Sequence, residues 1–516
     1  QGRVQGRFLS QASMFPVDLL VKAARQWPAS IAIQDGQRTL TFKELLSQAN
    51  ALAAAIQQIT GLQRPRVAVL SPNSLEMAIG IMAIHAGGFW LIPLNPRDAA
   101  AEVERQVELA KPDLFILDPA LADGFKAGGV PMVHSRKQGD APSIESLVRQ
   151  LKGSVPVFAC TDPSEPNAIK FTGGSSGKPK AVVQSFRTVN AVATTVATAF
   201  DLKSDEVYLL TAPMTHGAGA FMLPVLSRGG RCVIIDKPRP ESIADALERY
   251  RATMTWMPPT LLYMLMDVPG IETQDFSALR HLIWSGAAAT PEKFRQARKL
   301  FGNVVESAYG QAEASSVATV LRDHDIVDDS VLASVGKPTL LAHVEIMAPD
   351  GRILPVGEAG EIVIRGDIRM IEYLEMPEVT AKTIIDGWVH TGDIGQFDAR
   401  GYLYIKGRLR DVVITGGFNV YPLDVEDVLC RNPAVQEAVV FGLPDDKWGE
   451  RVEAAITLRP GAKAEPEELI EFVRQALGPV KTPKAVHVLA DLPRSVVGKV
   501  QRREVREQFL TRPGIG

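Results

Sequence analysis

Cysteine is scarce in this sequence. Only Cys160, Cys232 and Cys430 occur among its 516 residues. Three widely spaced cysteines exclude a disulfide framework and a cysteine-based metal site, because the first needs paired residues and the second needs close ligand spacing. A chain without disulfides suits a reducing compartment, so we expect a cytoplasmic protein.

An excess of either charge is also missing. The sequence has 56 lysines and arginines against 59 aspartates and glutamates, a net charge of -3. Such a balance gives no electrostatic field that would attract nucleic acid or acidic lipid. We therefore expect no nucleic acid among the partners.

A long apolar run that could span a membrane is absent as well. The longest uncharged stretch, Met77 to Leu94, contains Gly87, Gly88 and Pro93. These residues interrupt a helix, so we predict a buried helix that ends at the glycine pair, followed by a buried strand, and no integral membrane segment. The basic start of the chain is followed by no apolar run, so we expect no secretory signal.

The length of the chain predicts several domains, because single cores stop growing at about 300 residues. Strands and helices alternate up to about residue 335, which indicates a parallel sheet covered on both faces. Residues 118–166 read as a peripheral connection, and the short strands after residue 335 suggest an antiparallel sheet or small barrel. The predicted fold is α/β: a large N-terminal domain of layered subdomains with a small β-barrel-like subdomain (1–409), and a small mobile α+β C-terminal domain (410–516), with a hinge near Arg410.

Two local signals are specific. The turn Asp35-Gly36 between two short apolar segments predicts a β-hairpin. Thr41, with Glu44 three residues later, predicts a capping box at the start of the helix that follows.

The stretch from Phe171 to Lys180 is the most informative part of the chain. Its glycines, hydroxyls and lysines, in the order Thr-Gly-Gly-Ser-Ser-Gly-Lys-Pro-Lys, have the chemistry of a polyphosphate grip. A Walker-type loop is disfavoured, because Pro179 stands where that motif needs Ser or Thr. A nucleophile elbow around Ser175 needs a helix directly after it, whereas β-branched residues follow. A flexible phosphate loop between two strands fits better, and a solvated Gly/Ser turn remains the plain alternative.

Further motifs follow this loop in a fixed order. They are Ser285-Gly286-Ala287-Ala288, Tyr309-Gly310-Gln311-Ala312-Glu313, Trp388-Val389-His390-Thr391-Gly392-Asp393, Arg408-Leu409-Arg410-Asp411, Gly416-Gly417 and Gly498-Lys499. As an ordered set they resemble the adenylate-forming superfamily, which includes acyl- and aryl-CoA synthetases, peptide-synthetase adenylation domains and luciferases. The resemblance runs from about Leu40 to Arg502, nearly the whole chain.

The resemblance implies an ATP site. Tyr309 would stack on adenine, and Asp393 would accept both ribose hydroxyls, as a carboxylate can from a vicinal diol. Glu313 would hold Mg²⁺, which prefers hard carboxylate and phosphate oxygens. The full predicted set for ATP and AMP is Thr172, Gly173, Gly174, Ser175, Ser176, Gly177, Lys180, Gly286, Ala287, Ala288, Tyr309, Gly310, Asp393 and Arg408.

Three positions depart from the family pattern. Gly173 stands where serine is usual, and Ala181 where glycine is usual; the hydroxyls of Thr172, Ser175 and Ser176 remain. Ala312 replaces a threonine whose hydroxyl normally reaches the α-phosphate, so that contact is lost or supplied elsewhere.

Catalysis is assigned by resemblance to Lys499, His216 and Glu313. Lys499 would contact the carboxylate and the α-phosphate during adenylation, where a mobile cation offsets the charge of two approaching anions. Arg410 would be the hinge about which the small domain rotates. Gly416 and Gly417 would then line the tunnel for the pantetheine arm of CoA.

The acyl pocket is predicted by matching positions. Trp284 is large where a smaller apolar residue is common, so a small, medium-chain or aromatic acid is preferred over a long-chain one. No basic residue obviously enters the pocket to select a dicarboxylate. The predicted pocket residues are His216, Ala218, Met222, Trp284, Ala287, Ala308, Ser316 and Val317.

The predicted activity is that of an AMP-forming acyl-CoA synthetase that uses a carboxylic acid, ATP, Mg²⁺ and CoA. One alternative is an adenylating enzyme that loads a carrier protein. Others are a serine hydrolase that uses Ser175, and a nucleotide-binding protein with a degraded site, for which Ala312 is the hint. A homodimer is left open.

Overall fold

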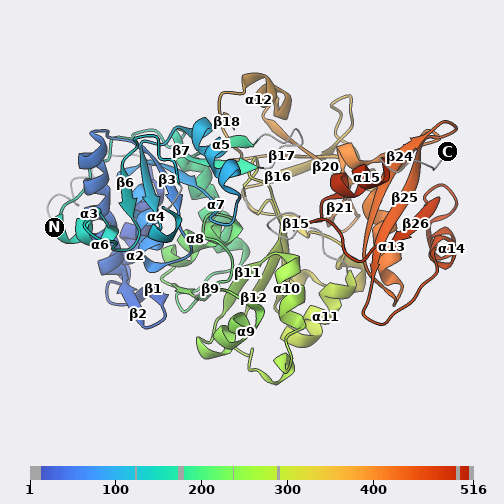
Figure 1. Cartoon of the computed structure of the whole chain (residues 1–516), viewed down its shortest axis with the longest axis horizontal. Helices are drawn as coiled ribbons and strands as arrows, with labels where there is room; N and C mark the ends of the chain where they lie inside the picture. Colours follow the sequence, from blue (N-terminus) through green and yellow to red (C-terminus); the bar gives the residue numbers. More distant parts are fainter. Residues whose placement is uncertain are drawn as a thin grey trace.

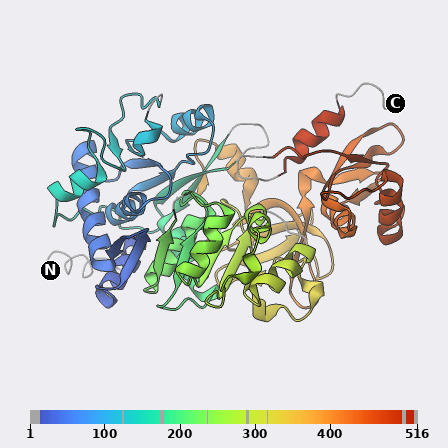
Figure 2. The same ribbon diagram turned by 60° about the horizontal axis from the view of Figure 1, so that its bottom comes forward.

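A computed structural model describes residues 13–122, 125–172, 179–235, 237–286, 291–315, 317–494 and 500–510 (Figure 1). In two views the blue N-terminal part lies at one end of the molecule and the orange-to-red C-terminal part at the other (Figures 1 and 2). No helix within the described ranges is long and apolar enough to cross a membrane.

The first sheet has seven strands in the order β18-β8-β7-β4-β3-β5-β6. Pairing from β7 to β6 is parallel, whereas β8 runs antiparallel to β7. The strands are β3 (Arg66–Leu70), β4 (Trp90–Pro93), β5 (Leu114–Leu117), β6 (Met132–His134), β7 (Pro166–Thr172), β8 (Lys180–Ser185) and β18 (Glu372–Tyr373); the helices beside them are α3 (Phe42–Thr60), α4 (Leu75–Gly87), α5 (Ala100–Ala110) and α6 (Ile144–Gln150).

The second sheet has nine strands in the order β15-β14-β13-β12-β11-β9-β10-β1-β2. Its strands are β1 (Ile31–Asp35), β2 (Arg38–Thr41), β9 (Val207–Leu210), β10 (Arg231–Ile234), β11 (Met254–Met257), β12 (His281–Ser285), β13 (Val305–Tyr309), β14 (Thr319–Leu321) and β15 (Lys337–Pro338). The helices with it are α2 (Pro16–Gln26), α7 (Phe186–Ala199), α8 (Met222–Ser227), α9 (Pro240–Arg249), α10 (Pro259–Met266) and α11 (Pro291–Phe301).

Two apolar cores explain how these layers hold together. The larger core joins the two sheets through α2, α3, α4, α7 and α8. The other lies under α9, α10 and α11, on the opposite face of the second sheet. Successive side chains of a strand point to opposite faces, so neighbouring residues of β12 belong to different cores.

The local predictions are confirmed. β1 and β2 pair antiparallel across Asp35-Gly36. The Thr41 hydroxyl accepts from the backbone N–H of Glu44, and the Glu44 carboxylate accepts from the backbone N–H of Thr41. Helix α4 ends at Gly87, and Gly88 caps it in the left-handed conformation before β4. Residues 118–166 were expected to be only a peripheral connection, but they also contain β6, which extends the first sheet. A strand of three residues is too short to show a recognisable pattern in the sequence.

A five-stranded antiparallel sheet follows, as the short strands after residue 335 predict. Its members are β16 (His343–Met347), β17 (Gly360–Arg365), β19 (Ile384–Ile385), β20 (Trp388–Phe397) and β21 (Leu403–Arg408); α12 (Pro377–Thr383) packs beside it. Strand β20 is a single strand of ten residues, longer than the sequence suggested.

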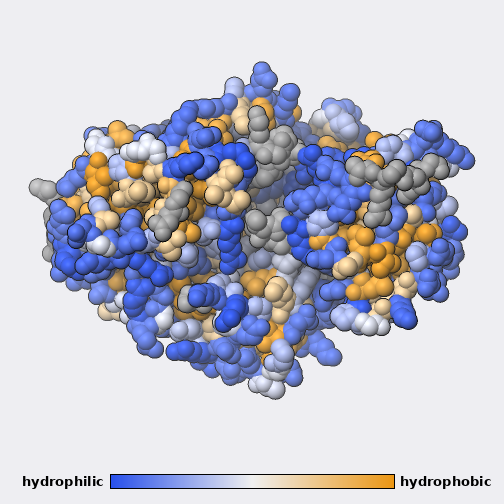
Figure 3. All heavy atoms as spheres, in the orientation of Figure 1, coloured by the Kyte–Doolittle hydropathy of each residue, from blue (hydrophilic) through white to orange (hydrophobic). Residues whose placement is uncertain are grey.

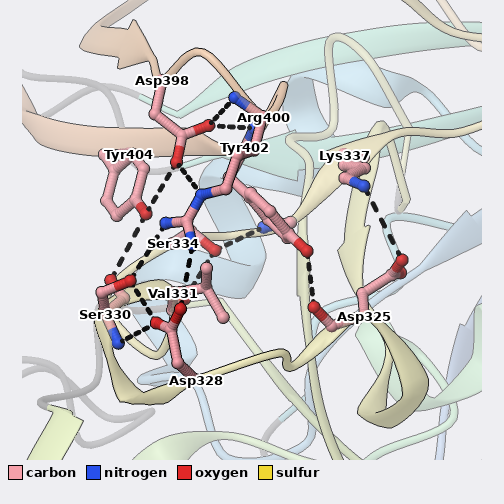
Figure 4. A network of polar contacts seen from close by, with 11 residues as sticks. Asp325, Asp328, Ser330, Val331, Ser334, Lys337, Asp398, Arg400, Tyr402 and Tyr404 are labelled. Carbon is pink, nitrogen blue, oxygen red and sulfur yellow. Dashed lines mark hydrogen bonds and ion pairs between the residues drawn. The ribbon is translucent and has the colours of Figure 1, made fainter.

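A polar network anchors the turn between β20 and β21 to the large domain (Figure 4). The Asp398 carboxylate accepts from the backbone N–H groups of Arg400 and Tyr402, at 2.9 and 3.0 Å. The Arg400 guanidinium reaches Asp328 at 3.2 Å and the Ser330 hydroxyl at 3.0 Å. These contacts fix the start of β21, the strand that leads to the predicted hinge.

The C-terminal unit is α+β, as predicted. Its elements are β22 (Val413–Thr415), β23 (Phe418–Val420), α13 (Pro422–Arg431), β24 (Val435–Asp445), β25 (Gly449–Leu458), α14 (Pro466–Leu477), β26 (Ala485–Val488) and α15 (Arg502–Leu510). It has its own apolar core between the sheet, α13 and α14. Mostly hydrophilic side chains cover its border with the larger part, and an apolar area lies farther to the right on its surface (Figure 3).

Candidate active site

The site is built where β7 ends and β8 begins. Thr172 is the last residue of β7, and Lys180, the first of β8, pairs with it in an antiparallel register. The predicted loop therefore does connect two strands. Its residues Gly173, Gly174, Ser175, Ser176 and Gly177 lie outside the described residues, as do Ala287, Ala288, Ser316 and Lys499.

Asp393 is the centre of the best-defined cluster. It is 5% exposed, on β20. Its Oδ2 accepts from the Tyr309 hydroxyl at 2.7 Å and from the Gln311 side-chain amide at 2.6 Å. Arg408, at the end of β21, lies with its Nε 2.7 Å from Oδ1. Two segments, one with Tyr309 and Gln311 and the other at the end of β21, thus converge on one carboxylate.

The electrostatics of this cluster are consistent with its hydrogen bonds. Burial, followed by the charge of Asp393, raises the pKa of Tyr309 well above its usual value. The phenol therefore stays protonated and donates to the carboxylate. Gln311 also donates to the Thr391 carbonyl at 3.1 Å. Sequence reasoning missed Gln311, because only its position inside a matched motif could have drawn attention to it.

Glu313 belongs to a second cluster, next to the end of the loop. Its Oε1 accepts from the Tyr373 hydroxyl at 2.7 Å. The Lys180 ammonium lies 4.8 Å from the centre of the Tyr373 ring, a cation–π distance. Burial and the charge of Glu313 raise the pKa of Tyr373, so the phenol keeps its proton. Tyr373 lies on β18, too far along the chain for any local pattern to connect it with Glu313.

Glycine is required at the end of β12. Gly286 has φ +91°, a left-handed conformation that side chains rarely adopt, although a Cβ there would meet no atom within 4 Å. The constraint is therefore conformational rather than steric. Gly310 follows β13 directly, so two predicted nucleotide-site glycines end neighbouring strands of the second sheet.

The predicted acyl-pocket residues are only partly brought together. Ala218, Met222, Ala308 and Val317 are buried in the core shared by the two sheets. His216 is exposed at the start of the segment that holds Ala218, with its Nδ1 2.9 Å from the Thr215 hydroxyl.

Trp284 lies apart from these residues. It belongs to the other core and packs edge-on against Phe294 of α11, with ring centroids 4.8 Å apart. The large aromatic side chain near His216 is instead Trp256. A Cβ atom added to Gly217, the residue after His216, would lie only 2.5 Å from the Trp256 ring. The argument for a short pocket based on Trp284 therefore does not hold in this structure.

We expect Trp284→Ala to destabilise the protein by about 3–5 kcal/mol, the usual cost of truncating a large buried aromatic, while leaving the preference among acids unchanged. Chemical denaturation and relative rates over an acid panel would measure the two effects. Trp284→Phe, which keeps most of the contact with Phe294, serves as the control. A changed acid preference at full stability would contradict the placement.

Tyr373→Phe isolates the hydrogen bond to Glu313, because the ring beside Lys180 stays. Loss of a hydrogen bond to a charged group is expected to raise the Mg²⁺ concentration needed for half-maximal AMP formation by about 10-fold. Tyr250→Phe, directly after α9 and at a distance from this cluster, is the matched control. A Mg²⁺ dependence equal to that of the control would count against this role for Tyr373.

The segment after β21 contains the predicted hinge and CoA residues. Arg410 is largely exposed, and its Nε is 3.7 Å from its neighbour Asp411. Asp411 and Glu426 instead pair with Arg502 of α15, at 2.8 and 2.7 Å. These ion pairs fasten the beginning of the C-terminal unit to its last helix.

Gly416 and Gly417 form the two-residue turn of the β22–β23 hairpin. Their φ values are +56° and +82°, as a primed turn requires. A Cβ on Gly416 would come within 2.8 Å of the Trp448 ring. The predicted CoA-tunnel glycines thus form a narrow hairpin tip whose shape depends on both of them.

Known proteins resemble this chain over nearly its whole length. A family model described as AMP-binding enzyme matches residues 20–374, and one described as AMP-binding enzyme C-terminal domain matches residues 424–499. A medium/long-chain fatty-acid–CoA ligase of Mycobacterium tuberculosis is 31% identical over 95% of this chain and 89% of its own. A feruloyl-CoA synthase of Amycolatopsis is 30% identical over 95% and 98%. The solved structure of an amide bond synthetase from Marinactinospora thermotolerans has a TM-score of 0.88, is 29% identical, and matches over 96% and 99% of the two chains.

Proposed function

The chain belongs to the AMP-binding enzyme family, and on this premise we propose that it is an AMP-forming acyl-CoA synthetase, an acid–thiol ligase. In the first step, a carboxylate attacks the α-phosphate of ATP to give an acyl adenylate and pyrophosphate. In the second step, the CoA thiolate attacks the acyl carbon and AMP leaves. The observation that carries the proposal is that named CoA ligases match both the part with the site and the C-terminal unit.

The cluster around Asp393 is proposed to hold the ribose. A carboxylate has about four acceptor positions, and three are taken in this structure by Tyr309, Gln311 and Arg408. If both ribose hydroxyls donate to Asp393, one of these three donors must move away from the carboxylate. Arg408 is the mobile candidate, since its side chain is 46% exposed.

The residues present also fit Mg²⁺. Glu313 offers a carboxylate beside the end of the phosphate loop, with only Oε1 engaged by a described side chain. Such a hard oxygen donor suits Mg²⁺ together with phosphate oxygens. When bound, the ion would neutralise phosphate charge; Tyr373 orients the carboxylate that holds it.

The second step is proposed to depend on the C-terminal unit. Rotation about Arg410 would remove Lys499 from the acyl adenylate and bring in the Gly416-Gly417 turn. The fixed start of β21 and the ion pairs of Arg502 make the segment between them the place where such a rotation would occur.

The test measures AMP and pyrophosphate release from Mg-ATP over a panel of fatty and aromatic acids, with and without CoA. Acid-dependent AMP formation that requires CoA, with a thioester as product, is the expected result. Pyrophosphate formation without turnover by CoA would point to a carrier protein as acceptor. Labelling of Ser175 by a fluorophosphonate, with no ATP use, would favour a hydrolase and overturn the proposal.

A further inference from the structure

One cation inside the molecule has no role in the proposed reaction. Lys170 is the third residue from the end of β7, and it is half-buried. Within the described ranges it has no hydrogen bond or ion pair. Burial lowers the pKa of its ammonium to about 8, and no carboxylate counteracts this shift. A half-buried ammonium without a partner is costly unless a ligand supplies one.

The register of the strands shows where Lys170 points. It lies opposite Val182 of β8, and side chains opposite each other share a face of the sheet. On that same face Gln184 donates to the carbonyl of Ala312 at 2.9 Å. The ammonium therefore faces the segment that holds Glu313. Its neighbours Ile169 and Phe171 pack on the other face, in the core beside α5.

Two histidines lie around the same space. His85, on α4, is 7% exposed, and its Nδ1 has no hydrogen-bond partner among the described residues. Burial and the charge of Lys170 lower its pKa to about 4, so the ring is neutral. The charge of Lys170 also lowers the pKa of His216, after the effect of burial, while Asp98 acts in the opposite direction. Lys170 is thus within electrostatic reach of both rings.

The position of this group relative to the candidate acyl pocket indicates its purpose. The core that contains Ala218 and Ala308 also contains Ile84 and Ala86, on either side of His85. Exposure falls in the order His216, Lys170, His85: the first is exposed, the second half-buried and the third buried. Lys170 therefore lies inward of the histidine that the family resemblance assigns to the reacting carboxylate, where the far end of an acyl group would lie.

We propose that Lys170 selects acids whose acyl part carries a second oxygen acceptor, a carboxylate or a ketone carbonyl. This inference rests on the proposed synthetase function, and it names the substrate class. A protonated Lys170 donates to the distal oxygen, and the unpartnered Nδ1 of His85 provides a second polar contact. Nothing in the sequence pattern indicates this role, because Lys170 is a single polar residue within a predicted strand.

The experiment compares three acids of equal chain length: a plain monocarboxylic acid, its oxo acid and the dicarboxylic acid. Wild-type protein, Lys170→Met and the surface control Lys203→Met are assayed for AMP formation with ATP and CoA. Lys170→Met is expected to lower kcat/KM about 10- to 100-fold for the distal-oxygen acid that the wild type prefers. The plain acid should change less than about threefold. If the oxo acid loses activity, Lys170 binds a ketone carbonyl. If the dicarboxylic acid loses activity, Lys170 binds a second carboxylate.

A second readout separates a direct contact from a structural effect. Because the pKa of Lys170 lies near 8, the wild-type preference for the distal-oxygen acid should decline as the pH rises through that value. His85, with a pKa of about 4, is already neutral in this range, so it does not account for such a decline. In Lys170→Met the preference should be low and flat with pH.

Three results would overturn the inference. Equal losses for all three acids would assign Lys170 to the reacting carboxylate, and unchanged kinetics would assign it no substrate contact. Both leave the synthetase function intact. Failure of wild-type protein to activate any acid, despite binding ATP, would remove the proposed function and this inference with it.

Discussion

Lys499→Ala is expected to slow acyl-adenylate formation by about 100- to 1000-fold, the range for losing one charge partner of a transition state. The lysine's assigned role is to offset negative charge as the carboxylate approaches the α-phosphate. That role ends once pyrophosphate has left. Thioester formation from supplied acyl adenylate and CoA should therefore proceed at a near-normal rate.

The two half-reactions are measured separately: acid-dependent exchange of labelled pyrophosphate into ATP for the first, and thioester release from synthetic acyl adenylate for the second. Lys463→Ala, an exposed lysine of the same C-terminal unit, controls for loss of surface charge. Equal losses in both half-reactions would reject the role, because a cation needed only for adenylation has no part in thiol attack.

Asp393→Asn is expected to lower kcat/KM for ATP by about 100-fold, since two hydrogen bonds from the ribose to a charged acceptor would weaken. The amide is similar in size, so the fold around β20 should persist. Arg408 loses the anion 2.7 Å from its Nε. Because Arg408 is about half exposed, we expect only a small change in stability from this loss.

An ATP analogue that lacks one ribose hydroxyl gives this prediction a specific readout. Wild-type protein should discriminate against the analogue, and Asp393→Asn should discriminate much less. Asp386→Asn is the control: Asp386 is exposed in the turn before β20, at φ +50°, where asparagine is well tolerated. Full discrimination by Asp393→Asn would move the ribose contact to another residue.

The sequence predicted most reliably the structural features that are set by residues close together in the chain. The Thr41–Glu44 capping box and the helix end at Gly87-Gly88 are local geometry, so they could be predicted without the fold. The ordered motifs also predicted Asp393 and Tyr309 as parts of one site, and the structure brings them within hydrogen-bonding distance.

The sequence predicted poorly which face of a strand a side chain occupies. Trp284 was placed in the pocket by matching its position to the family, but side chains in a strand alternate, and an error of one residue exchanges the two faces. Tyr373 and Lys170 were missed for a related reason. Their relevance comes from β18 and β7 pairing with β8, and no pattern along the chain shows strand order.

If ribose binds at Asp393 as proposed, the ion pair between Arg408 and Asp393 links nucleotide binding thermodynamically to the orientation of the C-terminal unit. Arg408 ends the strand whose start is anchored to the large domain, and it immediately precedes the predicted pivot. If ribose displaces this arginine, ATP favours whichever orientation of the C-terminal unit accommodates the released side chain. By reciprocity, any contact that holds the unit in that orientation tightens ATP binding by the same factor. A single exposed arginine can thus make the preferred orientation of the C-terminal unit depend on whether the nucleotide site is occupied.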